Sequence, residues 1–149
     1  MPLAGSFAYI EMVERDQTHP GFETFGVHMM LDGYDADPVR LADKALIAQL
    51  LHRIPAELGM HTIAPAQVVE VGPKNRKDPG GLSGVVMIAE SHLSFHTFPA
   101  RRFLTADLYT CQNDLETGRI TLMLQEAFAI REVDVHVQRR GLRFPRANL

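Results

Sequence analysis

The sequence predicts an α+β fold, a two-layer sandwich in which an antiparallel β-sheet is covered by helices on one face. Three observations predict it. Several apolar segments have strand length, two longer segments repeat apolar residues at helical spacing, and two strand segments share a connection short enough for a hairpin. At 149 residues and 46% hydrophobic, the chain is long enough for one domain with a substantial core.

The composition also limits the function classes. A formal charge of -3 gives no basic field that would concentrate the protein on nucleic acid or anionic lipid. No apolar run approaches the roughly 20 residues of a membrane span. Cys111 is the single cysteine, which fits a reducing compartment. We therefore expect a cytoplasmic protein that acts on a small molecule, with no nucleic acid or membrane partner.

The domain is predicted to begin after a variable lead-in. Residues 1–21, ending in QTHPG, form the lead-in, and residues 22–149 form the domain. Residues 24–34, TFGVHMMLDGY, are rich in β-branched, aromatic and apolar types and are followed by the polar DADP. This composition predicts the first strand.

An amphipathic helix is predicted next. Asp37 can cap its free amides, and Pro38 suits the first helical position. Apolar residues then recur at helical spacing until Pro55, which is expected to end the helix. The recurring residues are Val39, Ala42, Leu46, Leu50 and Ile54.

Four further strands are predicted in the middle of the chain. Residues 66–72 and 82–89 flank a basic loop, PKNRKDPGG, and the nearly continuous apolar run of 82–89 predicts a central strand. Residues 91–99 and 103–111 are joined by a short connection, Pro99 to Arg102. That connection predicts a hairpin with antiparallel pairing.

The last third of the chain predicts a second helix and a final strand. Gly118 leaves the start of the helix undefined, and residues 133–139, VDVHVQR, alternate as a strand. Both helices are expected to cover one face of the sheet. The helical positions are Ile120, Met123, Leu124, Ala127, Phe128 and Arg131.

The segment from Ala89 to Cys111 concentrates reactive side chains. A zinc site on His92 and His96 is not expected, because four strand residues separate them by about 13 Å, whereas zinc bonds measure about 2 Å. Ser83, in GLSG, does not match the G-x-S-x-G nucleophile elbow and is typical of a turn hydroxyl. Cys111 and His96 can pair across adjoining strands, although singly a buried thiol and a hydrogen-bonded histidine are more common.

Read together, these motifs resemble a known family. The order L-S-G-V-V-x-I-A-E-S-H-L-S-x-H-T-x-P, followed by A-D-L-Y-T-C, is similar to the prokaryotic S-adenosylmethionine decarboxylase proenzyme family over Leu82 to Cys111. The resemblance extends to the first strand. There Gly26, His28, Asp32 and Tyr34 resemble the opening G-x-H-x-x-x-D-x-Y of the family.

The resemblance implies a self-processing, pyruvoyl-dependent decarboxylase. In proteins like this, the hydroxyl of the residue matching Ser91 attacks the carbonyl of the residue matching Glu90. The ester then eliminates, so a β chain ends at Glu90 and an α chain begins at position 91 with a pyruvoyl group. That carbonyl forms a Schiff base with the substrate amine and accepts electrons as carbon dioxide leaves. No external cofactor and no metal are expected.

The resemblance also assigns roles to individual residues. His96 is expected to assist processing by proton transfer with Ser83 as its hydrogen-bonding partner, and Cys111 to protonate the α-carbon after decarboxylation. Because Ser91 and His96 are five residues apart, a regular strand would point them to opposite faces. A turn or bulge is therefore predicted around Glu90 to His92. A homodimer of processed αβ protomers is expected, with sites near sheet edges or between subunits.

The sequence departs from the family at three places. Members usually read H-T-W-P-E, whose glutamate is expected to hold the ribose of S-adenosylmethionine, but Ala100 occupies that position here. Alanine cannot accept the hydroxyl hydrogen bonds. Gln112 replaces a usual glycine, and the basic loop from Lys74 to Lys77 is longer than typical.

Three functions remain open. The leading hypothesis is an S-adenosylmethionine decarboxylase that supplies the aminopropyl donor for spermidine, with Phe25, Phe98 or Phe103 stacking on adenine. The second is a pyruvoyl decarboxylase of the same fold acting on arginine or ornithine, which Ala100 favours. The third is a non-processing homologue that binds a ligand. The intact reactive residues argue against the third: Glu90, Ser91, His96 and Cys111.

Overall fold

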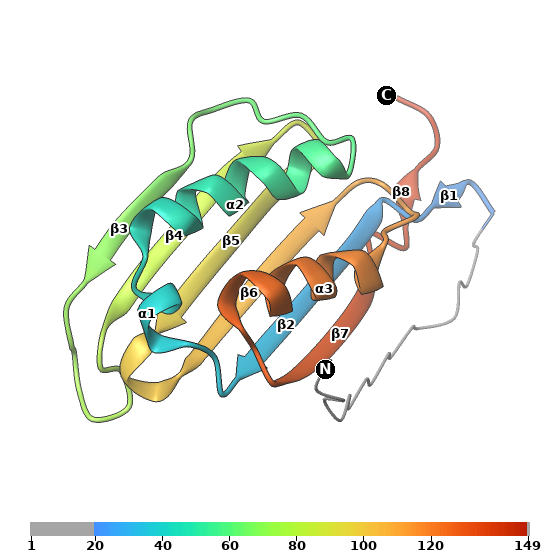
Figure 1. The fold of residues 1–149 in the computed structure, drawn as a ribbon. Helices are drawn as coiled ribbons and strands as arrows, with labels where there is room; N and C mark the ends of the chain where they lie inside the picture. The colour runs from blue at the N-terminus through green and yellow to red at the C-terminus, as the bar shows by residue number, and fades with distance from the viewer. Residues whose placement is uncertain (1–19, 149) are drawn as a thin grey trace.

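An antiparallel sheet organises the computed structural model, which describes residues 20–148 (Figure 1). Its six strands have the order β3-β4-β5-β6-β2-β7 within the described residues, and the helices lie on one face. The predicted α+β sandwich is therefore confirmed. The predicted lead-in lies outside the described residues except for residues 20 and 21. The strands are β2 (Gly26–Tyr34), β3 (Gln67–Val71), β4 (Gly81–Ile88), β5 (Ser91–Phe98), β6 (Phe103–Thr110) and β7 (Glu132–Arg140).

A short ribbon lies beside the main sheet. β1 (Phe22–Glu23) pairs with β8 (Phe144–Pro145), so the two ends of the described chain meet at the side of the molecule (Figure 1). The hairpin predicted between residues 91 and 111 is confirmed. β5 and β6 are joined by a single turn of 3-10 helix, η1 (Pro99–Arg101), and pair antiparallel.

The strand predicted as central is not at the centre. β4 is the second strand from the β3 edge, whereas β5 and β6 occupy the middle of the sheet. Its continuous apolar run has a different cause. Val86 and Ile88 are buried in the core, while Val85 and Met87 alternate with them on the opposite face and are 41% and 54% exposed.

The single predicted helix is two helices. Asp37 caps α1 (Pro38–Leu41) as predicted, but the chain breaks after Leu41, and Asp43 caps α2 (Lys44–Glu57). Pro55 does not end α2. A proline lacks a backbone donor but keeps its carbonyl, and Pro55 accepts hydrogen bonds from the amides of Leu58 and Met60, which complete the final turn.

The second helix and the last strand occur where predicted. α3 (Thr117–Phe128) includes Gly118 in its first turn and ends at Ala129, whose φ of 50° is left-handed. Arg131 therefore lies beyond the helix rather than on its apolar face. In the part of the chain that the structure describes, no helix has the length and apolar composition of a membrane span.

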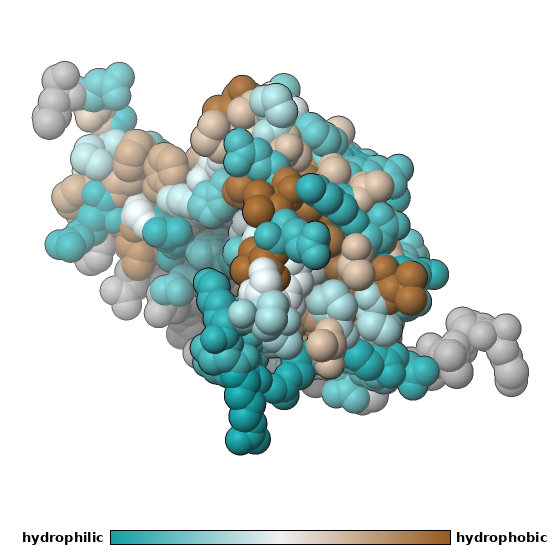
Figure 2. All heavy atoms as spheres, turned by 90° about the vertical axis from the view of Figure 1, so that its left-hand side faces the viewer, coloured by the Kyte–Doolittle hydropathy of each residue, from teal (hydrophilic) through white to brown (hydrophobic). Residues whose placement is uncertain are grey.

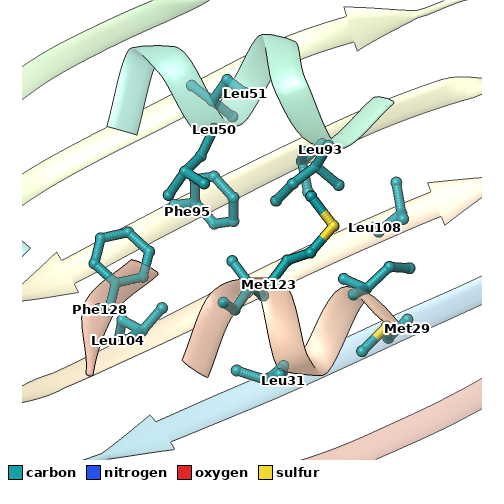
Figure 3. Close-up of a cluster of buried hydrophobic side chains, with 14 of the residues drawn as sticks. Met29, Leu31, Leu50, Leu51, Leu93, Phe95, Leu104, Leu108, Met123 and Phe128 are labelled. Carbon is teal, nitrogen blue, oxygen red and sulfur yellow. The ribbon is translucent and has the colours of Figure 1, made fainter. Parts of the chain in front are cut away.

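The core lies between the helices and the sheet (Figure 3). Phe95 of β5 is fully buried and meets Phe128 of α3 edge to face, at a ring-centroid distance of 6.2 Å. Residues at odd positions of β5 contribute to this core, which leaves the even positions on the other face. Figure 3 labels the main contributors: Met29, Leu31, Leu50, Leu51, Leu93, Phe95, Leu104, Leu108, Met123 and Phe128.

The face of the sheet opposite the helices is uncovered by any described element, and we call it the open face. The even residues of β5 lie on it, flanked by the matching positions of β4 and β6. Several large hydrophobic side chains are exposed there: Tyr34, Val69, Val85 and Met87.

Candidate active site

The predicted processing position lies in a tight turn between β4 and β5. Ile88 pairs with Ser91, so only Ala89 and Glu90 form the turn. Ser91 has a φ of 152°, a conformation that residues other than glycine rarely adopt. Such a conformation costs about 1 to 3 kcal/mol and persists only where the surroundings hold it. The predicted turn around Glu90 to His92 is therefore present.

The carbonyl of Glu90 is hydrogen-bonded by the end of β6. Ser91 pairs with Thr110, and the backbone N–H of Cys111 donates to the Glu90 carbonyl oxygen at 3.0 Å. Gly26 allows this close approach, because a Cβ at that position would collide with the backbone of Thr110 and Cys111. A donor in this position polarises the carbonyl and stabilises negative charge that develops on its oxygen.

The side chain of Glu90 is also held. Its carboxylate accepts hydrogen bonds from the backbone N–H of His61 at 3.1 Å and from His61 Nδ1 at 2.9 Å. Burial by itself raises the pKa of the Glu90 carboxyl, but the hydrogen bonds from His61 outweigh it and leave that pKa below its ordinary value. The turn is therefore fixed through both its backbone and its side chain.

A second histidine contacts Ser91 directly. Ser91 Oγ lies 3.2 Å from Nδ1 of His92, at hydrogen-bonding distance. The His92 ring packs against the edge of Tyr109, which also packs against His28. His28 Nε2 in turn lies at hydrogen-bonding distance from an Asp107 carboxylate oxygen, 2.9 Å away. From the sequence, His92 was weighed only as a zinc ligand, although its position next to Ser91 was a usable signal.

Ser83 and His96 form the hydrogen bond predicted for them, with Ser83 Oγ 2.9 Å from His96 Nδ1. The structure does not bring this pair to Ser91 within one chain. His96 is five residues along β5 from Ser91, which corresponds to about 17 Å in an extended strand. The assistance to processing predicted for His96 therefore has no direct contact with Ser91 in the single chain.

Cys111 lies at the Ser91 end of the site and is exposed rather than buried. The Cys–His pair considered from the sequence is not formed in one chain. His96 pairs with Thr105, six residues before Cys111, so the two side chains are about 20 Å apart along the strands. The reason is the register, which aligns Cys111 with Glu90 instead of His96.

The aromatic residues proposed for substrate binding lie at both ends of the open face. Phe98 and Phe103 stack at 5.8 Å near His96 and line a hollow of about 350 Å³ with Lys77 and Arg101. Phe25 lies at the other end, 6.1 Å from Tyr109 in ring-centroid distance. One chain therefore does not gather the aromatic groups around one point.

Ala100 lies in η1 and lines a separate hollow of about 390 Å³, which Glu70 also lines. The basic loop borders the same region, and Arg101 donates to the carbonyl of Arg76 at 2.7 Å. Hydrophilic side chains project at the lower edge of this side of the molecule in Figure 2, where Figure 1 places the connection from β3 to β4. The loop is thus tied to the hairpin that carries Ala100.

Among residues 20–148, no group of three or more histidine, cysteine, aspartate or glutamate side chains is arranged to hold a metal ion. The acidic side chains of the open face are close enough to interact. Burial raises the pKa of Asp32, and Asp134 and Asp107 raise it further, while His136 opposes them. This part of the face therefore disfavours additional negative charge.

Comparisons with known proteins identify related sequences and a related structure. The family model described as S-adenosylmethionine decarboxylase matches residues 27–141. The "S-adenosylmethionine decarboxylase proenzyme" of Thermotoga petrophila is 30% identical over 119 residues, covering 80% of this chain and 86% of the relative. The proenzyme of Pyrococcus furiosus is 28% identical over 120 residues, covering 80% and 81% of the two chains.

A solved structure has the same fold. The crystal structure of the adenosylmethionine decarboxylase from Aquifex aeolicus VF5 matches with a TM-score of 0.69 at 26% identity. The match covers 85% of this chain and 99% of that chain. The sheet and helices described above are therefore the whole of that neighbour's fold rather than a fragment of it.

The contact between Glu90 and His61 predicts a pH-dependent effect on stability. In a Ser91→Ala background, which keeps the chain continuous, Glu90→Gln should lower the free energy of unfolding near neutral pH. Because the pKa of Glu90 is lowered in the folded chain, this stabilisation is present above the ordinary carboxyl pKa and is lost as the pH falls through the folded value. Denaturant unfolding at about pH 7 and about pH 3 measures it.

Glu126→Gln is the matched control, because Glu126 is exposed on α3. It should change the free energy of unfolding little at either pH. An equal loss for Glu90→Gln at both pH values would contradict an ionised, hydrogen-bonded Glu90.

Proposed function

The chain belongs to the S-adenosylmethionine decarboxylase family, and from this premise we propose that it is a self-cleaving, pyruvoyl-dependent decarboxylase of S-adenosylmethionine. Cleavage between Glu90 and Ser91 gives a β chain ending at 90 and an α chain beginning at 91. The product is the aminopropyl donor for spermidine, so the reaction belongs to polyamine biosynthesis. We place it in the reducing cytoplasm, where the exposed Cys111 thiol stays reduced.

The observation that carries the proposal is the contact between the Glu90 carbonyl and the Cys111 amide. Attack by Ser91 on that carbonyl places negative charge on its oxygen, and the amide already donates to it. The strained φ of Ser91 favours a reaction that releases this residue from its peptide bond. Both features make this peptide bond more reactive than a peptide bond in an ordinary turn.

Cys111 supports the decarboxylation step. The pyruvoyl group made from Ser91 supplies a carbonyl that holds the substrate amine and accepts electrons as carbon dioxide leaves. The Cys111 backbone is bonded to the carbonyl of Glu90, one residue from the position where this group is formed. We assign its exposed thiol as the proton donor to the substrate α-carbon.

We propose that a second copy of the chain completes the site. Ser91 and Cys111 lie at one end of the open face, whereas Ser83 and His96 lie at the other. The face is also apolar enough to pack, since Val85 and Met87 are exposed on it. A homodimer that buries this face brings the two halves together and explains why neither half is complete alone.

A homodimer with one particular twofold axis would bring the two halves of the site together. A twofold axis that lies between two stacked sheets and crosses their strands reverses the strand direction of one copy relative to the other. Sheets pack about 10 Å apart, so this axis brings His96 of each copy over Ser91 of its partner when it passes near the middle of β5. Phe98 and Phe103 of one copy then approach Phe25 of the other, and both can border one substrate.

Ala100 favours a second candidate substrate class. A substrate without ribose needs no carboxylate at this position, which suits a free amino acid such as arginine or ornithine. Glu70 lines the same hollow as Ala100 and carries a carboxylate, so the ribose contact has a candidate replacement. Ala100 by itself therefore does not decide between the two substrate classes, and an assay of carbon dioxide release does.

The purified protein is expected to consist of two fragments. Intact-mass analysis should find a break between Glu90 and Ser91 and a blocked terminus at 91, and Ser91→Ala should remain at full length. Carbon dioxide release should occur with S-adenosylmethionine and not with arginine or ornithine. A full-length wild-type chain would exclude the pyruvoyl mechanism, and release from arginine or ornithine alone would assign the second candidate.

Cys111→Ala should separate the two stages. Cleavage should proceed, because the backbone N–H that contacts Glu90 is retained, while turnover should fall by about 10²-fold or more. Amino-terminal sequencing after incubation with substrate should show alanine at 91, because misplaced protonation transaminates the pyruvoyl group. Loss of cleavage in this variant, with turnover unaffected in the cleaved fraction, would contradict the role assigned to the thiol.

Co-expression of two inactive variants tests the shared site. His96→Ala chains should not cleave when expressed alone. Ser91→Ala chains cannot cleave, because they lack the attacking hydroxyl. In a mixed dimer, the Ser91→Ala chain supplies His96 to the intact Ser91 of the His96→Ala chain. The His96→Ala chain should therefore be cleaved, and a mass tag on one variant identifies which chain was cut. Absence of cleavage in isolated mixed dimers would refute the shared site.

A further inference from the structure

We propose that His92 is the base that accepts the proton of Ser91 during self-cleavage, acting within its own chain. This inference rests on the proposed function, because it concerns the same peptide bond between Glu90 and Ser91. His92 takes the proton of the Ser91 hydroxyl, while His96 of the partner copy keeps the assisting role proposed above. The proton transfer by His92 takes place within one chain and is distinct from any contribution of the partner copy.

The contact itself favours His92. Ser91 Oγ and His92 Nδ1 are 3.2 Å apart, at the upper end of ordinary hydrogen-bond lengths. A hydroxyl can donate to Nδ1 when the ring proton is on Nε2, and a neutral imidazole in that tautomer is a general base. His96 is about 17 Å away along the same strand, so it cannot reach this hydroxyl without a partner copy.

The His92 ring is held in place by its neighbour across the strand. Tyr109 pairs with His92 and meets its ring edge to face at 5.9 Å. Tyr109 is itself fixed, because the guanidinium of Arg140 lies 4.3 Å from its ring centroid and Phe25 packs beside it. A base whose ring is packed in this way needs little reorganisation before proton transfer.

The location of His92 also connects the two halves of the site. His92 lines a hollow of about 370 Å³ on the open face together with Ser83 and His96. Substrate-sized space therefore extends from the residue that touches Ser91 to the pair at the far end. Within residues 20–148, no side chain other than His92 forms a hydrogen bond with Ser91 Oγ.

The proposed step is an N-to-O acyl shift in which one proton moves from the Ser91 hydroxyl to the Ser91 amine through His92. His92 Nδ1 takes the hydroxyl proton as Ser91 Oγ forms a bond to the Glu90 carbonyl carbon, and the charge on the oxygen is held by the Cys111 N–H. When the carbon–nitrogen bond breaks, the proton on the imidazolium passes to the departing amine of Ser91. His92 returns to its neutral form, and an ester with a free amino group remains.

The test replaces His92 by asparagine. The side-chain oxygen of asparagine can accept the hydrogen bond from Ser91 but is not a base, so a role limited to holding the hydroxyl would survive His92→Asn. We expect cleavage of this variant to slow by about 10²-fold or more in a time course of intact mass. We also expect added imidazole to accelerate cleavage of His92→Ala.

Two further measurements complete the test. His52→Asn is the matched control, because His52 is exposed on α2 away from the site, and it should cleave at the wild-type rate. Circular dichroism on the uncleaved His92 variants should match Ser91→Ala. If His92→Ala fails to fold, the cleavage rate of His92→Asn alone tests the role of His92. A wild-type cleavage rate in His92→Asn would overturn the assignment of His92 as the base.

Co-expression separates this inference from the proposed function. Ser91→Ala chains should restore cleavage to His96→Ala chains but not to His92→Asn chains, because His92 acts on the serine of its own chain. Restored cleavage of His92→Asn would overturn the inference and leave self-cleavage intact. A wild-type chain that never cleaves would instead refute the proposed function.

Discussion

The pairing of the end of β6 with the turn between β4 and β5 is the constraint on which the site depends. The register aligns Ser91 with Thr110, and this alignment brings the Cys111 amide to the Glu90 carbonyl. A shift of one residue would turn every side chain of β5 to the other face. The buried Leu93 and Phe95 prevent such a shift, because it would expose them and bury His92 and His96. The hydrophobic core therefore sets the chemistry at the turn.

Local sequence patterns predicted most of the fold. Apolar and β-branched runs identified most strands, alternation identified the last one, and the Asp37–Pro38 pair identified the start of the first helix. The break at Asp43 was missed, because the apolar spacing continues through it and a second capping aspartate was not weighed against that spacing. The position of β4 next to the edge strand β3 could not be read from its apolar run. A strand with a buried face and an exposed apolar face has the same composition as one that is buried on both.

The sequence proposed a set of site residues, whereas their geometry required the structure. The Ser83–His96 hydrogen bond and the turn at Glu90 followed from the motif and from side-chain parity. The separation of His96 from Ser91 required the strand register, and the contact of Glu90 with His61 joins residues 29 positions apart. Backbone groups such as the Cys111 amide carry no signal in the sequence, because every residue but proline has one.

The strand order indicates that the proposed cut at Glu90 would leave the fold in place. Residues before the cut supply β3, β4 and β2, and residues after it supply β5, β6 and β7. In the sheet these two sets alternate, since β4 pairs with β5 and β2 lies between β6 and β7. Separation of the fragments would break three ladders and open the core. The proposed cut would open only the strained turn, and the contact with His61 would hold the new end at Glu90. The fold holds the fragments together with the same hydrogen bonds that align the reacting groups.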